Sequence, residues 1–242
     1  GTAPRPNEYS SRIHPRRGPS AAAAATATSA AANAAALALL LIVGLSACKR
    51  HEPPTIDSTW TDSFDRSTLG SDWYATQDSY FLRDGKLNAR GAHNHPLWLR
   101  RKLPRDAIVE LDCWSESPSG DLKVEAWGDG ESFDPDQGAY LATAYVLVMG
   151  GWNNSQSIIA RRDEHAPGIP RRNDPKVEPG RKYHWKIVRK GGQLRWFVDD
   201  MTTPFLSLDD PAPLEGQDHE YFAINNWESD VWFDNLAIRP AE

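Results

Sequence analysis

The sequence predicts an all-β protein, an antiparallel sandwich or jelly roll of two sheets that follows an N-terminal signal segment. Three observations support this prediction. From Trp60 onward, short runs of β-branched and aromatic residues alternate with turn-forming residues. The same region has no amphipathic helical pattern of useful length. Many short strands separated by frequent turns are typical of sandwiches and jelly rolls.

Each expected strand is a short run of residues with high β propensity. Asp84-Gly85 and Gly191-Gly192 mark two-residue hairpin turns, because both central residues of such a turn can take positive φ. The segment from His165 to Pro179 contains four prolines and predicts a surface loop, a place where function often lies. In chain order, the expected strands are Tyr80–Arg83, Lys86–Ala89, Leu97–Arg101, Ala107–Ser115, Leu122–Trp127, Tyr140–Met149, Ser157–Arg161, Lys182–Arg189, Gln193–Val198, Tyr221–Asn225 and Val231–Ile238.

An export signal precedes the predicted sandwich. An apolar run ends in Leu45-Ser46-Ala47-Cys48, and Arg12, Arg16 and Arg17 form a positive flank ahead of it. This order resembles the lipobox of bacterial lipoproteins, in which the chain is cut before the cysteine and the cysteine carries a diacylglycerol. The resemblance implies that residues 1–47 are a signal segment and that Cys48 is lipidated. Residues 48–59 then form a polar tether to the domain, residues 60–242.

Two other interpretations of the alanine-rich N-terminal region are a permanent membrane helix and a disordered tail. A stable membrane span needs roughly 20 predominantly apolar residues, whereas polar residues interrupt the stretch before Leu37. The lipoprotein interpretation is therefore preferred. Lys49 follows the cysteine in place of the Asp that resembles an inner-membrane retention signal. We therefore expect a lipid anchor in the cell envelope, in the outer membrane or at the cell surface.

Charge and cysteine content exclude some functions. The first 47 residues contain four arginines and one glutamate, so the rest of the chain is three units more negative than the whole, which carries −6. Such a domain is a poor partner for nucleic acid, because phosphate binding relies on basic surfaces. If Cys48 is lipidated, Cys113 has no disulfide partner, and we expect it to be a buried apolar thiol.

Three segments carry a resemblance to a known fold family. Arg189–Asp199 looks like the late hairpin of the concanavalin A-like lectin and glucanase superfamily, and Val231–Ile238 looks like its closing strand. Asp62–Asp65 resembles its opening strand, which pairs with the closing one. The resemblance covers residues 60–240 and implies two curved sheets with a concave face that often holds sugars. Asp200 stands where relatives often have Gly, a local departure.

Paired acids are the first candidates for chemistry. Glucanases of this superfamily carry three acids on one strand, and the segment from Glu110 through Asp112 to Glu116 has one residue too many for that pattern. Strand alternation still places these acids on one face, and Glu125 shares a face with Lys123 and Trp127 on the next strand. Glu110, Asp112 and Glu125 could thus supply the acid and nucleophile of a retaining glycosidase. The alternative, which we prefer, is an ordinary half-exposed sheet whose charges pair across strands.

Aromatic and amide side chains are the second candidates. Sugars stack their C–H faces on aromatic rings and hydrogen-bond to amides, and Trp and Asn are neighbours in Gly150–Ser155 and again in Asn225–Trp227. Each Trp taken singly is more often a core residue. Together the clusters favour sugar binding. The expected ligand-binding residues are His95, Trp98, Glu125, Trp127, Trp152, Asn153, Arg161, Asn226 and Trp227.

Histidines and strand-end acids give weaker signals. His93 and His95 share a strand face, but no third metal ligand has recognisable spacing. Jelly-roll polysaccharide lyases combine His, Tyr, Arg and an amide, and the available residues of those types are His95, Tyr145, Arg161 and Asn225. The superfamily resemblance also implies a structural calcium, for which Asp62 and Asp234 are the expected ligands.

The sequence therefore predicts a lipid-anchored envelope protein that binds a carbohydrate on the concave sheet of a jelly-roll domain. A glycoside hydrolase or polysaccharide lyase acting on an extracellular or cell-envelope glycan is the alternative. A structural or adhesive envelope protein with an empty groove is a third possibility. Fold alone does not decide among them.

Overall fold

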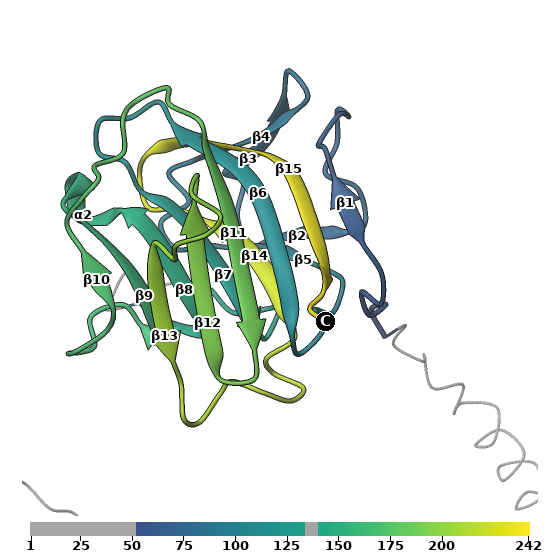
Figure 1. Ribbon diagram of the computed structural model, residues 1–242. Helices are drawn as coiled ribbons and strands as arrows, with labels where there is room; N and C mark the ends of the chain where they lie inside the picture. Colours follow the sequence, from purple (N-terminus) through teal and green to yellow (C-terminus); the bar gives the residue numbers. More distant parts are fainter. Residues whose placement is uncertain (1–51, 134–139) are drawn as a thin grey trace, which may run out of the picture. The chain divides into compact units, whose positions relative to one another are not determined.

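The computed structural model describes residues 52–133 and 140–242 of the chain. Its regular structure is β except for one four-residue helical segment, α2 (Gly151–Asn154). The strands form two antiparallel sheets that lie one over the other as layers (Figure 1). This confirms the predicted all-β sandwich. Within the described ranges, no helix is both long and apolar enough to cross a membrane. The predicted signal segment and Cys48 lie outside these ranges.

One sheet has eight strands, and its centre is the pair formed by β6 and β15. The closing strand β15 pairs with β4 through its first residues and with β1 through Leu236–Ile238. The expected pairing of the opening and closing strands is thereby confirmed. In spatial order, the strands are β13 (Leu206–Asp209), β12 (Gln193–Val198), β11 (Tyr183–Lys190), β6 (Ala107–Ser115), β15 (Asp230–Pro240), β4 (Lys86–Arg90) and β3 (Tyr80–Arg83), with β1 (Trp60–Asp62) beside β15.

The second sheet has seven strands, with β7 in the middle. Its short members β2 and β10, like β13 of the other sheet, were not expected, because segments of two to four residues carry too little periodicity. β10 lies inside the predicted loop of residues 165–179. In spatial order, the strands are β10 (Arg171–Arg172), β9 (Gln156–Asp163), β8 (Leu141–Gly150), β7 (Leu122–Gly128), β14 (Tyr221–Asn225), β5 (Leu97–Leu99) and β2 (Trp73–Ala75).

The core lies between the sheets and follows strand alternation. In β6, Val109, Leu111 and Cys113 are buried in the core, while the residues between them are only half buried. Cys113 is a free, fully buried thiol whose pKa is raised by burial, and this confirms the expected apolar role. Because one face of each central strand is taken up by the core, the polar side chains of that strand lie on the opposite, outer face of the sheet.

The two predicted hairpin turns differ in detail. Asp84 and Gly85 both have positive φ, at 51° and 67°, as expected for a two-residue turn. In the other turn Gly191 has φ 58°, but Gly192 is not among the residues with positive φ. Gly192 is needed for space, since a Cβ atom there would lie 2.1 Å from the carbonyl oxygen of Asp210.

Asp62 fastens the first strand to the sandwich. Its carboxylate accepts hydrogen bonds from the backbone N–H of Phe64 and the indole N–H of Trp73, each at 2.8 Å, and it pairs with Arg66. Burial alone would raise the pKa of Asp62, but these donors outweigh burial and hold the pKa below its ordinary value. The carboxylate is therefore fully engaged within the protein.

The expected calcium site is not supported by this geometry. The oxygens of Asp62 are occupied by protein donors, and Asp234 lies 4.0 Å from the ammonium of Lys182. A calcium ion takes six to eight oxygen ligands. No cluster of three or more His, Cys, Asp or Glu suited to a metal ion occurs in residues 52–133 and 140–242. The described contacts of Asp62 and Asp234 therefore give the expected calcium site no support, and these two ligands stay a prediction.

Replacement of Asp62 tests its anchoring role. We expect Asp62→Ala to lower the free energy of unfolding by about 3 kcal/mol, because a buried indole and a guanidinium lose a charged partner. The loss should shrink as pH falls below about 4, where the carboxyl becomes protonated in the unfolded chain, and should reach its minimum below the lowered pKa of the folded protein. Urea unfolding at several pH values measures both. Asp234→Ala is the control, with an expected loss of about 1 kcal/mol or less. Equal losses for both variants would contradict this account.

Candidate functional site

The outer face of the seven-stranded sheet, which faces away from the core, is largely covered. In β7, Leu122, Val124 and Ala126 belong to the core, so Lys123 and Glu125 face the other way. Both charged side chains are nevertheless buried, because loops between the strands fold over this face. A sheet face that buries two opposite charges next to each other differs from an ordinary half-exposed sheet.

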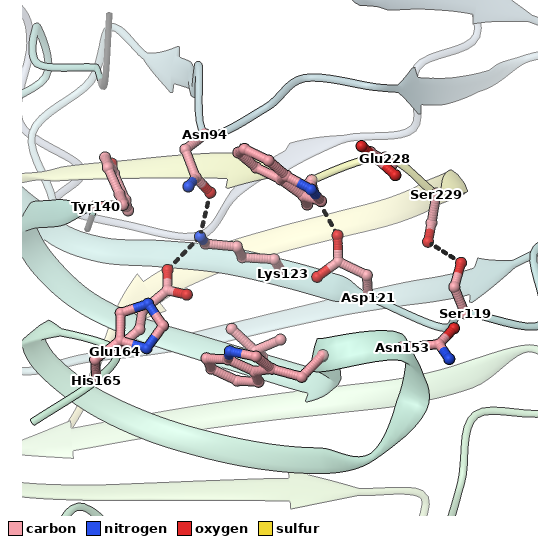
Figure 2. Close-up of a pocket in the computed structure, with 14 residues that line it drawn as sticks. Asn94, Ser119, Asp121, Lys123, Tyr140, Asn153, Glu164, His165, Glu228 and Ser229 are labelled. Carbon is pink, nitrogen blue, oxygen red and sulfur yellow. Dashed lines mark hydrogen bonds and ion pairs between the residues drawn. The ribbon is translucent and has the colours of Figure 1, made fainter. Parts of the chain in front are cut away.

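A pocket of about 510 Å³ opens at one end of this face. Its walls come from the loops β4–β5, β6–β7, β9–β10 and β14–β15, together with α2 (Figure 2). The volume lies in the range of small-ligand pockets. The lining residues are Asn94, Ser119, Asp121, Lys123, Tyr140, Val148, Gly151, Trp152, Asn153, Glu164, His165, Trp227, Glu228 and Ser229.

Lys123 lies at the centre of the pocket floor. Its ammonium donates to Asn94 Oδ1 at 2.7 Å and to a carboxylate oxygen of Glu164, as Figure 2 shows, and it lies 4.8 Å from the centre of the Tyr140 ring. Burial alone would lower the pKa of Lys123, but Glu164 and Glu125 outweigh it and hold the pKa above its ordinary value. Lys123 is therefore a fixed positive charge.

Glu125 lies beside Lys123 on the same face of β7. Its Oε1 accepts hydrogen bonds from the Tyr140 hydroxyl at 2.8 Å and from Asn225 Nδ2 at 2.7 Å. Its Oε2 is buried and has no hydrogen-bond partner among the described residues. Burial raises the pKa of Glu125, although Lys123 and the two donors oppose that shift. Glu125 therefore holds the hydroxyl of Tyr140, which lines the pocket, but is not itself one of the lining residues.

Asp121 forms a second polar point on the pocket floor. Its carboxylate accepts a hydrogen bond from the backbone N–H of Trp227, which links the β6–β7 and β14–β15 loops. Burial raises the pKa of Asp121 to about 6. The nearby negative charges of Glu164 and Glu228 add to this shift, and the positive charge of Lys123 opposes it. Asp121 is thus an acid whose charge is poorly compensated.

One aromatic wall is formed by Trp152, which lies on an unusual backbone. Trp152 and Asn153 have positive φ, at 50° and 57°, and the preceding Gly150 has φ 68°. A left-handed Trp is strained and persists only where its surroundings hold it. Asn154 supplies that support, because its side chain donates to the carbonyl of Val177 at 2.8 Å and accepts from its N–H at 2.9 Å.

The opposite wall is formed by Trp227, whose side chain is 38% exposed. Its ring stacks on His93 with centroids 4.7 Å apart and planes 21° from parallel. The neighbouring Asn226 is fully buried, and its Oδ1 accepts a hydrogen bond from the N–H of Ala92 at 3.0 Å. Asn226 therefore holds the loop that presents Trp227 and does not itself reach the pocket.

Three of the residues predicted to bind ligand line the pocket, namely Trp152, Asn153 and Trp227. The other predicted Trp residues are fully buried. Trp98 lies on the outer face of the sheet, covered by the loop that contains Ser132, whose carbonyl accepts its indole N–H at 3.1 Å. Trp127 was expected beside Glu125, but it packs in the core, because a β-bulge with φ 60° at this residue turns it to the other face.

His95 and Arg161 also lie outside the pocket lining. His95 stacks on Phe133 at 5.2 Å, and Arg161 binds the carboxylate of Asp210 at 2.9 Å. The four residues expected for a lyase do not form one cluster, although Tyr145 and Arg161 both donate to Oδ2 of Asp210. Tyr145, the nearest strand partner of Arg161, packs in the core, and Asn225 bonds to Glu125.

The three acids predicted for catalysis do not form one cleft. Glu110 and Asp112 lie on β6 in the eight-stranded sheet, whereas Glu125 lies on β7 in the other sheet. Asp112 is hydrogen-bonded to His184 and Asn235, each at 2.8 Å, and Glu110 is paired with Arg239. Glu110 and Asp112 therefore cannot act together with Glu125 as an acid and nucleophile, because the consecutive strands β6 and β7 belong to opposite layers. The preferred alternative, charges paired across strands, describes Glu110 and Asp112 well.

Sequence reasoning missed the acids that line the pocket. Asp121 precedes a strand, Glu164 follows one, and Glu228 lies in a turn, so each resembles an ordinary loop acid. The available signal for Asp121 was its spacing, since it comes two residues before Lys123 and four before Glu125, although its own φ of 68° places it outside the strand. Glu164 carried no comparable signal, because its contact with Lys123 depends on how the β9–β10 loop folds.

Comparisons with known proteins show the fold. No protein-family model and no curated protein matches this chain. Among solved structures, carbohydrate-binding module CBM66 from Bacillus subtilis is similar over 70% of this chain and 96% of that one, with 15% identity and a TM-score of 0.54. The metal-free exoplasmic/lumenal domain of VIP36 is similar over 76% and 92%, with 8% identity and a TM-score of 0.57. A Bacillus subtilis protein of unknown function with a galectin-like fold matches over 76% and 97%, with 14% identity and a TM-score of 0.55.

The raised pKa of Asp121 predicts how stability depends on pH. An acid whose pKa is higher in the folded protein contributes stability at pH values below 3.8, and that contribution is lost as pH rises through about 6. Asp121→Asn removes the charge and keeps an oxygen for the Trp227 N–H. We expect this variant to be more stable than wild type at pH 8, by on the order of 2 kcal/mol, and equally stable at about pH 4.

Urea unfolding at both pH values measures this difference. The same substitution at the exposed Asp209, on the other sheet, controls for the loss of one negative charge. A variant that is less stable than wild type at pH 8 would show that the ionised Asp121 is a stabilising group.

Proposed function

We propose that this protein binds a carbohydrate in the pocket on the outer face of the seven-stranded sheet. The observation that carries the proposal is the pairing of two Trp walls with polar groups between them. Trp152 and Trp227 supply flat apolar surfaces, and Asp121 and Asn153 present oxygen and nitrogen atoms. Sugars combine C–H faces with hydroxyls, so they match a pocket of this composition.

The comparisons support the same class of ligand. One similar structure is a carbohydrate-binding module, and the VIP36 domain has been solved with mannose and with Man3GlcNAc, each together with Ca²⁺. The low identities extend only the fold to this chain. The proposal of sugar binding therefore rests on the pocket residues described above, and the neighbours are examples of sandwiches of similar fold that bind sugars.

We further propose that the domain is held at the bacterial cell envelope by a lipid on Cys48. The support is the lipobox resemblance of Leu45-Ser46-Ala47-Cys48 and the tether of residues 48–59. An anchored sugar-binding domain would keep a glycan close to the cell. It would gain effective concentration where the anchored copies are dense.

Hydrolysis of a glycan is the second candidate, and one observation favours it. The pKa of Asp121, about 6, suits a general acid near neutral pH, and a further carboxylate, Glu164, lines the same pocket. If the protein releases reducing ends from an oligosaccharide and Asp121→Asn abolishes that release, the protein is a glycoside hydrolase. Binding without turnover would leave the pocket as a lectin-like site.

The two Trp walls give the main test of binding. We expect Trp152→Ala and Trp227→Ala each to weaken binding about tenfold or more, because a sugar ring loses one stacking surface. A glycan array followed by calorimetry with the purified full-length protein measures this. Trp114→Ala is the matched control, since that half-buried Trp stacks on Trp232 on the other sheet.

Binding in EDTA and in added calcium tests whether the ion takes part. Equal affinities would show that calcium takes no part in binding, whereas loss of binding in EDTA would show that an ion is required. An array without any signal above background, at concentrations where a control lectin gives one, would overturn the proposed function.

The lipid anchor has its own test. In a bacterial host we expect the mature chain to begin at Cys48 and to carry a lipid mass on that residue, because the signal segment is cut before it. Intact-mass spectrometry of the membrane fraction measures this. Cys48→Ala should accumulate as an uncleaved, unlipidated precursor. A wild-type chain that is cleaved elsewhere, or that stays unmodified, would contradict the anchor.

A further inference from the structure

The charges around the pocket are unbalanced, and this bears on which sugars it takes. Three carboxylates line it, on Asp121, Glu164 and Glu228, against the single ammonium of Lys123. Their mutual repulsion is visible at Asp121, where Glu164 and Glu228 both help to raise the pKa of the carboxyl. The inference below rests on the proposed function, since it concerns the ligand of the same pocket.

Lys123 is not available to neutralise an acidic ligand. An ammonium has three N–H donors. Two of them are used by Asn94 and Glu164, and the third side of the ammonium faces the ring of Tyr140. The side chain is 2% exposed, so a ligand anion would have to displace Glu164 to reach it. Displacing a partner from a buried ion pair is costly.

Two of the carboxylates remain open to a ligand. Asp121 uses one oxygen for the N–H of Trp227, and its Oδ1 has no hydrogen bond within the described residues. Glu228 is exposed and makes no hydrogen bond or ion pair with any residue that the structure describes. The pocket thus offers unused acceptors next to the Trp227 wall and no unused Lys or Arg cation among the residues that line it. His165 lies on the other wall, where its ring packs edge-on against Trp152 with centroids 5.7 Å apart. The pocket accommodates donors, and most favourably donors that carry positive charge.

We infer that the pocket selects sugars that carry a protonated amine over neutral sugars, and excludes sugars that carry a carboxylate. The hydroxyls and the ring of such an amino sugar would use the Trp walls. Its ammonium would lie against Asp121 and Glu228, while a uronic acid would place like charges together in a partly desolvated site.

Three matched sets of oligosaccharides test this selectivity. They are oligomers of glucosamine, of N-acetylglucosamine and of a uronic acid, of equal length. Each is titrated into the full-length protein at a pH above 6, where Asp121 is ionised, but low enough for the amine to be protonated. We expect the glucosamine oligomer to bind about tenfold tighter than its acetylated form, and the uronate oligomer not to bind measurably. The preference should shrink at high salt, because screening weakens interactions between charges.

Variants assign the preference to particular residues. Asp121→Asn and Glu228→Gln should each lower the affinity for the glucosamine oligomer several-fold. The ratio of this affinity to that for the acetylated oligomer, which is the advantage of the amine, should fall as well. Asp209→Asn, which removes one negative charge from the exposed strand β13 of the eight-stranded sheet, is the control and should leave the advantage unchanged. Glu228→Gln changes an exposed side chain, so it remains informative if Asp121→Asn folds poorly.

The outcomes separate this inference from the proposed function. If no oligosaccharide of any charge binds, the proposed function fails. If sugars bind but the acetylated form binds as tightly as the glucosamine form, or the uronate binds best, the charge selectivity is wrong and sugar binding stands. If the preference survives in both Asp121→Asn and Glu228→Gln, it arises elsewhere and the inference is overturned.

Discussion

The buried ammonium of Lys123 is the constraint around which the pocket is organised. A lone charge at this depth would be strongly destabilising, so its neighbours must supply compensation from several directions. Asn94, Glu164 and the face of Tyr140 do so, and each belongs to a different loop or strand end. One side chain on a central strand thereby gathers three distant segments of the chain over the same sheet face.

The same arrangement determines the character of the cavity. Because the ammonium of Lys123 is already bound by its neighbours, the pocket floor offers carboxylate oxygens to a ligand, and the walls offer the rings of Trp152 and Trp227. The sandwich core makes no direct contribution to this chemistry. It holds β7 rigidly between β8 and β14, so that Lys123 and Asp121 keep fixed positions relative to the loops.

The fold could be predicted from the sequence because it depends on local patterns. Alternation in β6, the turn at Asp84-Gly85 and the likeness of the first and last strands to a known fold all describe short segments. The site could be predicted only in part. Trp152 and Trp227 were found because Trp beside Asn suits sugar chemistry. Trp127 was predicted on the wrong face of β7, because a bulge at that residue turns its side chain into the core. Glu110 and Glu125 were predicted to act together, but they lie on β6 and β7, which belong to different sheets.

The left-handed stretch at Gly150–Asn154 has a consequence for recognition. Because the side-chain amide of Asn154 both donates to and accepts from the backbone of Val177, the backbone that carries Trp152 is tied to a neighbouring segment by contacts within the protein. A partner that docks there loses little affinity to ordering the receptor, so complementarity of shape, more than induced fit, would set how tightly it is held. The same fixed backbone makes position 152 a convenient place to change which ligands the pocket prefers. A different side chain can be introduced there while the contacts of Asn154 keep the backbone in place.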